Sequence, residues 1–89
     1  MPERTATIAS RVGLHARPAS VFIEAVKRQP MKVTISKGGS TPLDAASILS
    51  IMSLGAANGD IVTLAAEGDG AEAALEELAG LLETDLDAE

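Results

Sequence analysis

Residues 31–39 read MKVTISKGG, and the first six of them alternate apolar and polar side chains with a period of two. This alternation, in a segment rich in β-branched residues, is typical of a strand with one buried face. The buried face consists of Met31, Val33 and Ile35. Gly38 and Gly39 follow directly and can adopt the positive φ angles of a hairpin turn. The segment therefore predicts a strand that turns back into a short second strand over residues 40–43.

On the N-terminal side of this hairpin, the spacing of apolar residues predicts a helix and a weaker strand. Within residues 16–28, apolar side chains recur at i, i+3, i+4 and i+7, which is the spacing of the buried stripe of a helix. The stripe consists of Ala19, Phe22, Ile23 and Val26. Gln29-Pro30 ends this helix. Residues 5–9 alternate more weakly and are predicted to form the first strand.

On the C-terminal side, two more helices enclose a fourth strand. Residues 47–54 are predicted to be helical, with Ser47 as a good N-cap and Gly55 closing the helix. Asn58-Gly59 marks a turn before residues 60–66, whose nearly continuous apolar character suits a central strand. A last helix carries an apolar stripe of Ala71, Ala74, Leu75, Leu78 and Leu82.

The predicted order of elements is βαββαβα. Four short strands are too few for a doubly wound nucleotide-binding fold, so we expect an α+β fold in which helices stack on one face of a mainly antiparallel sheet. The chain of 89 residues contains no internal repeat, linker or low-complexity tract. We therefore predict a single domain spanning residues 1–89.

The composition argues against several classes of function. Phe22 is the only aromatic residue, so the chain has almost no surface on which bases or sugar rings could stack. We expect neither nucleic-acid nor carbohydrate binding. Because the chain has no cysteine, disulfides and thiolate zinc sites are excluded. There is neither a leader-like segment nor an apolar run of about 18 residues, so we expect a cytoplasmic protein without membrane insertion.

The net charge of −6 conceals a strong asymmetry along the chain. All seven basic residues lie within the first 37 positions, which contain only two of the thirteen acidic residues. Such polarity predicts one end that attracts anions or acidic partners and another that keeps the protein in solution. A solvated acidic helix at the end of the chain would explain the acidic part equally well.

Residues 13–20 read GLHARPAS and join the first predicted strand to the first predicted helix. The imidazole of His15, with an ordinary pKa of about 6.5, is substantially neutral at physiological pH and can attack phosphorus through a ring nitrogen. The first helical turn leaves the backbone N–H groups of residues such as Ala16 and Arg17 without intrahelical partners, which favours a bound anion. Arg17 can also offer a bidentate fork to phosphoryl oxygens. The segment therefore favours phosphate chemistry at His15.

Two further residues shape the backbone of this segment. Pro18 suits the first helical turn, because its missing N–H would have no partner there in any case. The residue before a proline avoids the helical region, so the first helical residue falls between Ala16 and Pro18. Gly13 permits a sharp turn and a close approach to a ligand.

The residues alone leave several roles open for His15. A single histidine between a strand and a helix can be purely structural. A metal site would have to be completed by scattered carboxylates, since there is no cysteine and no second histidine. Acyl transfer is disfavoured because the chain has no Gly-x-Ser-x-Gly elbow and the nearby Ser20 would need an oriented partner.

Residues 13–19 resemble the active-site signature of HPr, the histidine-containing phosphocarrier family of the bacterial sugar phosphotransferase system. Residues 47–55 resemble the regulatory-serine helix of that family, and the length and element order also agree. The resemblance implies an open-faced β-sandwich of four antiparallel strands and three helices, acting as a monomer without a cofactor. It further implies that His15 accepts a phosphoryl group on Nδ1 from phosphorylated enzyme I and passes it to the A component of a sugar-specific enzyme II. Arg17 would hold the phosphoryl oxygens.

The resemblance also assigns roles to the second helix and its surroundings. Ser47 corresponds to the serine that an HPr kinase phosphorylates in some bacteria, which slows transfer and creates a docking species for a transcriptional regulator. Serine is also simply a good N-cap, so a structural role explains Ser47 as well. The apolar residues of this helix are too many for one buried side, so some of them would form a docking patch near the active site. The expected docking residues are Ser20, Ile48, Leu49 and Met52.

The sequence leaves two further functions open. A regulatory or nitrogen-branch paralogue would use the same phosphohistidine chemistry with different partners. An interaction domain could keep the fold without phosphoryl transfer, although it would have no need of an exposed imidazole beside a guanidinium. Finding which A components accept the phosphate would discriminate between the carriers.

Overall fold

A four-stranded sheet forms one layer of the structure, a computed structural model that describes residues 2–9, 13 and 16–84. Its strands are β1 (Glu3–Thr7), β2 (Val33–Lys37), β3 (Leu43–Asp44) and β4 (Ile61–Ala66). They lie in the order β1-β4-β2-β3, and every neighbouring pair is antiparallel. Strand β4 lies inside the sheet, between β1 and β2, as its nearly continuous apolar sequence predicts.

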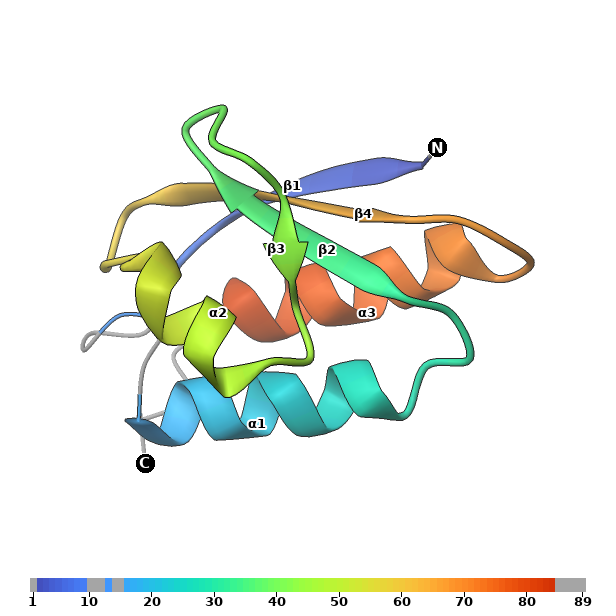
Figure 1. Cartoon of the computed structure of the whole chain (residues 1–89), viewed down its shortest axis with the longest axis horizontal. Coiled ribbons are helices and arrows are strands. Elements are labelled where there is room, and N and C mark those ends of the chain that lie inside the picture. The colour runs from blue at the N-terminus through green and yellow to red at the C-terminus, as the bar shows by residue number, and fades with distance from the viewer. Residues whose placement is uncertain (1, 10–12, 14–15, 85–89) are drawn as a thin grey trace.

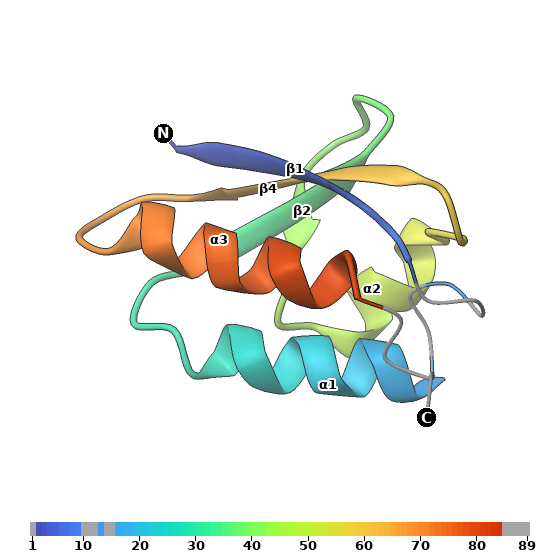
Figure 2. The ribbon, with the colours of Figure 1, turned by 180° about the vertical axis from the view of Figure 1, so that it is seen from behind.

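Three helices cover one face of this sheet (Figures 1 and 2): α1 (Ala16–Lys27), α2 (Ile48–Leu54) and α3 (Ala71–Leu82). The chain order βαββαβα and the single covered face confirm the predicted α+β open-faced β-sandwich. Helices α1 and α3 lie side by side beneath the strands, and α2 packs at the edge of the sheet formed by β3.

The core lies between the sheet and the helices and is aliphatic except for Phe22, which is fully buried. The predicted stripe of α1 is buried along its whole length, as are the apolar positions of α3. Each helix therefore presents its apolar stripe to the sheet, and the burial of these stripes provides the main stabilisation of the fold.

The N-terminal and second strands differ slightly from the predicted ranges. The first strand spans Glu3–Thr7 rather than residues 5–9, because β4 supplies partners only from Ile61 to Ala66. The second begins at Val33 rather than at Met31, which is half-buried and packs against the core beyond the strand. The sequence periodicity thus located both strands, while the partner strand determined their ends.

The return strand of the hairpin is shorter than predicted. It comprises only Leu43 and Asp44, whereas the sequence predicts pairing over residues 40–43. Gly38 and Gly39 do adopt positive φ angles, of 59° and 78°. Pro42 lies directly before β3 and has no N–H to donate to a ladder, which explains why pairing begins only after it.

Candidate functional site

The first turn of α1 carries Arg17, one of the predicted phosphate-handling residues. The helix begins at Ala16, and Arg17 and Ser20 lie exposed on its first turns. Pro18 and Ala19 are buried between them, so the core anchors the turn while the polar side chains face the surroundings. His15 lies outside the described residues, as does the side chain of Ala16. The placement of Arg17 at a helix start suits an anion, because the first N–H groups of a helix have no intrahelical acceptor.

Gly13, two positions before His15 in the sequence, is buried and has a φ of 79°. A Cβ at this position would lie 2.7 Å from the carbonyl oxygen of Ala56 and 3.0 Å from the Cα of Ala57. The sequence predicts that Gly13 allows a close approach to a ligand, but the close approach is to the backbone of the α2–β4 connection. Glycine is required here because of both its φ and this contact.

Helix α2 has the ends that its sequence predicts. The Oγ of Ser47 accepts a hydrogen bond from the N–H of Ser50 at 3.3 Å, and Gly55 closes the helix in the left-handed conformation with a φ of 65°. Ser47 is half-buried rather than enclosed. It therefore acts as a structural N-cap, whatever further role it has.

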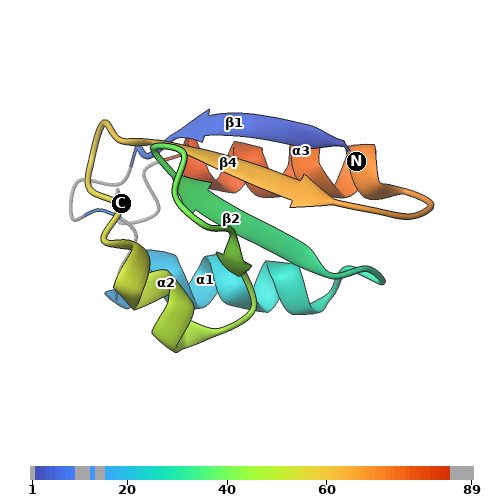
Figure 3. The same cartoon turned by 45° about the horizontal axis from the view of Figure 1, so that its top comes forward.

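Three apolar side chains of α2 are exposed, and we call them the α2 patch: Ile48 is 49% exposed, Leu49 78% and Met52 47%. Ile51 and Leu54 face the core instead. The apolar residues of this helix are therefore divided between the core and the surface, as the sequence predicts. Helix α2 contacts α1, on which Ser20 and the 37% exposed Val21 lie, and Figure 3 shows the two helices next to each other.

An ion pair between Lys37 and Asp60 lies at the end of α2 and was not predicted from the sequence. The Nζ of Lys37 is 3.4 Å from Oδ2 of Asp60 and also donates to the carbonyl of Gly55 at 3.2 Å. The same Oδ2 accepts from the N–H of Ala57 at 2.9 Å. The bond from Ala57 and then that from Lys37 lower the pKa of the Asp60 carboxyl below its ordinary value. The ionised carboxylate therefore holds this connection, and its contribution is lost as the pH falls through the lowered pKa.

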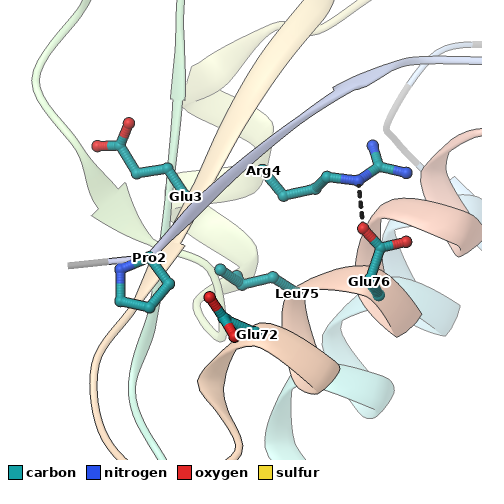
Figure 4. Close-up of a pocket in the computed structure, with 6 residues that line it drawn as sticks. All are labelled: Pro2, Glu3, Arg4, Glu72, Leu75 and Glu76. Atoms are coloured by element: carbon teal, nitrogen blue, oxygen red, sulfur yellow. Dashed lines mark hydrogen bonds and ion pairs between the residues drawn. The ribbon is translucent and has the colours of Figure 1, made fainter.

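A second ion pair joins β1 to α3 (Figure 4). The Nε of Arg4 donates to Glu76 at 2.8 Å. A second guanidinium nitrogen of Arg4 lies 3.2 Å from Glu83, directly after α3. These bonds raise the pKa of Arg4, and the bond from Arg4 lowers the pKa of Glu76. Because all three side chains are partly exposed, we expect a modest contribution to stability.

Within residues 2–9, 13 and 16–84, no three His, Cys, Asp or Glu side chains are grouped so that they could hold a metal ion. Among the helices of that same part of the chain, none has the length and apolar character needed to cross a membrane.

Comparison with known proteins identifies the family. Residues 2–84 match the family model described as the HPr component phosphorylation site of the phosphotransferase system. The phosphocarrier protein HPr of Streptomyces coelicolor is 46% identical over 82 residues, which cover 92% of this chain and 88% of that protein. HPr of Haloferax volcanii is 43% identical over 83 residues, covering 92% and 93%. The chain therefore belongs to the HPr family of phosphocarrier proteins.

A solved structure and a further relative agree with this assignment. The crystal structure of HPr-C-His from Thermoanaerobacter tengcongensis superimposes with a TM-score of 0.90 and 38% identity, covering 100% of this chain and 99% of that one. The HPr-like protein Crh of Bacillus subtilis is 34% identical over 86 residues, covering 97% of this chain and all of that protein. The relatives thus include proteins named phosphocarrier protein HPr and a protein named HPr-like protein Crh.

Proposed function

We propose that this chain is a cytoplasmic phosphocarrier, which accepts a phosphoryl group on His15 from phosphorylated enzyme I and passes it to the A component of a sugar-specific enzyme II. The observation that carries the proposal is the segment GLHARPA at residues 13–19, which continues in the sequence into the first turn of α1, in a chain of the HPr family. Its single histidine leaves one imidazole in the chain for this chemistry.

In the proposed reaction, the lone pair of Nδ1 of neutral His15 attacks the phosphorus atom. The bond between phosphorus and enzyme I breaks as the new phosphorus–nitrogen bond forms, so the step needs no oxidant or reductant. The start of α1 stabilises the phosphoryl oxygens by about 0.3–1 kcal/mol through the helix dipole at an exposed site. Arg17 adds charge-assisted hydrogen bonds. This modest stabilisation suits a carrier, which must also release the group.

The α2 patch is the proposed docking surface for enzyme I and the A component. It is apolar and exposed, and α2 contacts the helix whose first two turns carry Arg17 and Ser20. Met52 suits a surface with several partners, since its flexible thioether adapts its shape. Basic residues on α1 and just beyond it, such as Lys27 and Arg28, would attract an acidic partner.

The direct test is incubation of the chain with enzyme I and labelled phosphoenolpyruvate, followed by mapping of the labelled residue. Label on His15 that is then transferred to an A component supports the proposal. A chain that takes up no label from active enzyme I would contradict it.

Replacement of Arg17 is expected to slow transfer while the fold stays intact. Arg17→Ala removes one charge-assisted contact to the phosphoryl group, so the transfer rate should fall at least about tenfold, equivalent to ~1.4 kcal/mol. Arg17→Lys should restore the rate only in part, because lysine lacks the planar fork. Rapid-quench measurement of labelled protein checks both variants, and an unchanged rate for Arg17→Ala would remove Arg17 from the mechanism.

The second candidate is a regulatory or nitrogen-branch paralogue with the same chemistry. The likeness to Crh of Bacillus subtilis and the half-buried position of Ser47 beside the α2 patch favour this candidate. An HPr kinase and a transcriptional regulator would then be partners. A panel of A components discriminates: transfer to sugar-specific components supports the general carrier, and transfer to none of them supports the paralogue.

Substitutions of Ser47 separate its capping role from a regulatory one. Ser47→Ala should lower the free energy of unfolding by about 1 kcal/mol through loss of the bond from Ser50. Ser47→Asp keeps a capping oxygen, so stability should hold. Its charge should raise the KM for enzyme I by up to about fivefold, equivalent to the ~1 kcal/mol of an exposed charge pair. If Ser47→Asp shows the wild-type KM, negative charge at this position does not regulate docking.

A further inference from the structure

The connection between α2 and β4, residues 55–60, contacts the chain on both sides of residues 10–12. On one side it pairs with Ile8, directly after β1: Gly59 N–H donates to the carbonyl of Ile8, and Ile8 N–H donates to the carbonyl of Asp60, both at 2.8 Å. The Nδ2 of Asn58 donates to the carbonyl of Ala9 at 3.1 Å. Figure 3 shows this connection beside the end of β1.

On the other side, the same connection supports Gly13. The backbone of Ala56 and Ala57 lies so close to Gly13 that no side chain could fit between them. Ala56 is itself buried, so it has little room to shift. His15 follows two residues later and α1 begins at Ala16. The position of the connection therefore determines where Gly13 is held, two residues before His15 in the sequence.

Two side chains, the Asp60 carboxylate and the ammonium group of Lys37 at the end of β2, bind the backbone of residues 55–57, and we call this pair the Lys37–Asp60 brace. Asp60 binds the N–H of Ala57 through its side chain at 2.9 Å, and its own N–H donates to the carbonyl of Ala57, also at 2.9 Å. Lys37 joins the Asp60 carboxylate to the carbonyl of Gly55. The brace thus fixes both ends of the peptide segment on which Gly13 packs.

We propose that Lys37 and Asp60 are positioning residues for phosphoryl transfer, because their contacts hold the Ala56–Ala57 backbone against Gly13 and so align the segment that carries His15. This inference rests on the proposed function of His15. Neither side chain touches the phosphoryl group in this mechanism. The side chains of Lys37 and Asp60 are 37% and 39% exposed, so a purely stabilising role would be small.

The test compares Asp60→Ala with the matched control Glu76→Ala. Both variants remove an exposed carboxylate from an ion pair, but Glu76 lies on α3 and pairs with Arg4. At a temperature where both variants are fully folded, Asp60→Ala should slow transfer from enzyme I by about tenfold, less than the roughly hundredfold cost of a 1 Å misplacement. Its KM should stay unchanged, because the α2 patch is intact. Glu76→Ala should behave as wild type.

A spectroscopic measurement distinguishes positioning from loss of stability. In Asp60→Ala, but not in Glu76→Ala, the NMR signals of the Gly13 amide and the His15 ring should shift. Lys37→Met should reproduce both the slower transfer and the shifts of the NMR signals. Lys37→Arg can still pair with Asp60, so its transfer rate and NMR signals should match those of the wild type. Lys37→Met also serves as the second test if Asp60→Ala folds poorly.

The possible outcomes separate this inference from the proposed function. If the wild-type chain takes no label, the proposed function fails and the inference fails with it. If the wild type is labelled and Asp60→Ala transfers at the same rate, the inference alone is overturned. It is also overturned if transfer slows without a shift of the Gly13 and His15 signals, or if Glu76→Ala slows transfer equally.

Discussion

His15→Ala is expected to abolish acceptance of the phosphoryl group from enzyme I completely. The chain contains one histidine, so no other imidazole can take its place. The fold should be retained, because the core consists of residues such as Phe22, Ile35 and Leu64 and does not depend on a polar ring in a connection. Incubation with enzyme I and labelled phosphoenolpyruvate, together with circular dichroism of the variant, measures both effects.

The chemistry of the label provides an independent check on this result. A phosphorus–nitrogen bond should survive alkali and be lost in mild acid, whereas a phosphoserine behaves in the opposite way. Label that persists in His15→Ala, or label that is stable to acid and labile in alkali, would contradict the carrier mechanism. It would point to a serine such as Ser47 as the primary site.

Gly13→Ala is expected to have the second largest effect, on both stability and transfer. A residue other than glycine at a φ of 79° is strained by roughly 1–2 kcal/mol. The new Cβ would also lie 2.7 Å from the carbonyl oxygen of Ala56, so one of the two backbones must move. A displacement near 1 Å at the segment leading to His15 should slow transfer by roughly a hundredfold.

Gly39→Ala is the matched control for this substitution. Gly39 has nearly the same φ, 78°, but nothing lies within 4 Å of its Cβ position. Gly39→Ala should therefore lose stability through the strained φ alone, without a steric clash. Its transfer rate should equal that of the wild type. Thermal unfolding and rapid-quench kinetics of both variants separate the two contributions. Equal transfer rates for the Gly13 and Gly39 variants would show that the close contact with Ala56 has no influence on His15.

The apolar excess of α2 alone predicts a patch but not its members, whereas the resemblance to HPr named Ile48, Leu49 and Met52 among the expected docking residues. The apolar residues of α2 exceed what one buried side can hold, and this excess predicts an exposed patch. Which residues form it depends on how α2 is rotated against β3 and α1, which it contacts. The structure exposes Ile48, Leu49 and Met52 and buries Ile51 and Leu54.

Local sequence patterns determined the type and order of the helices and strands in the described part of the chain. Helix stripes repeat every three to four residues and strands alternate every two, so each pattern is complete within one element. The N-cap at Ser47, the closing Gly55 and the glycine turn at residues 38–39 are also local, and the structure confirms them. The segment GLHARPA likewise indicated phosphate chemistry from a single short run of residues, and the role of His15 remains a prediction.

Contacts between distant parts of the chain were decided only by the tertiary structure. The ends of β1 and β3 depend on where their partner strands run, and the length of β3 is also limited by Pro42. The approach of Gly13 to Ala56 and the pairing of Lys37 with Asp60 join segments that no common periodicity links. Such contacts form because the antiparallel sheet brings the end of β1, the end of β2 and the start of β4 together at one end of the sheet. A pattern within a single element contains no information about contacts between elements.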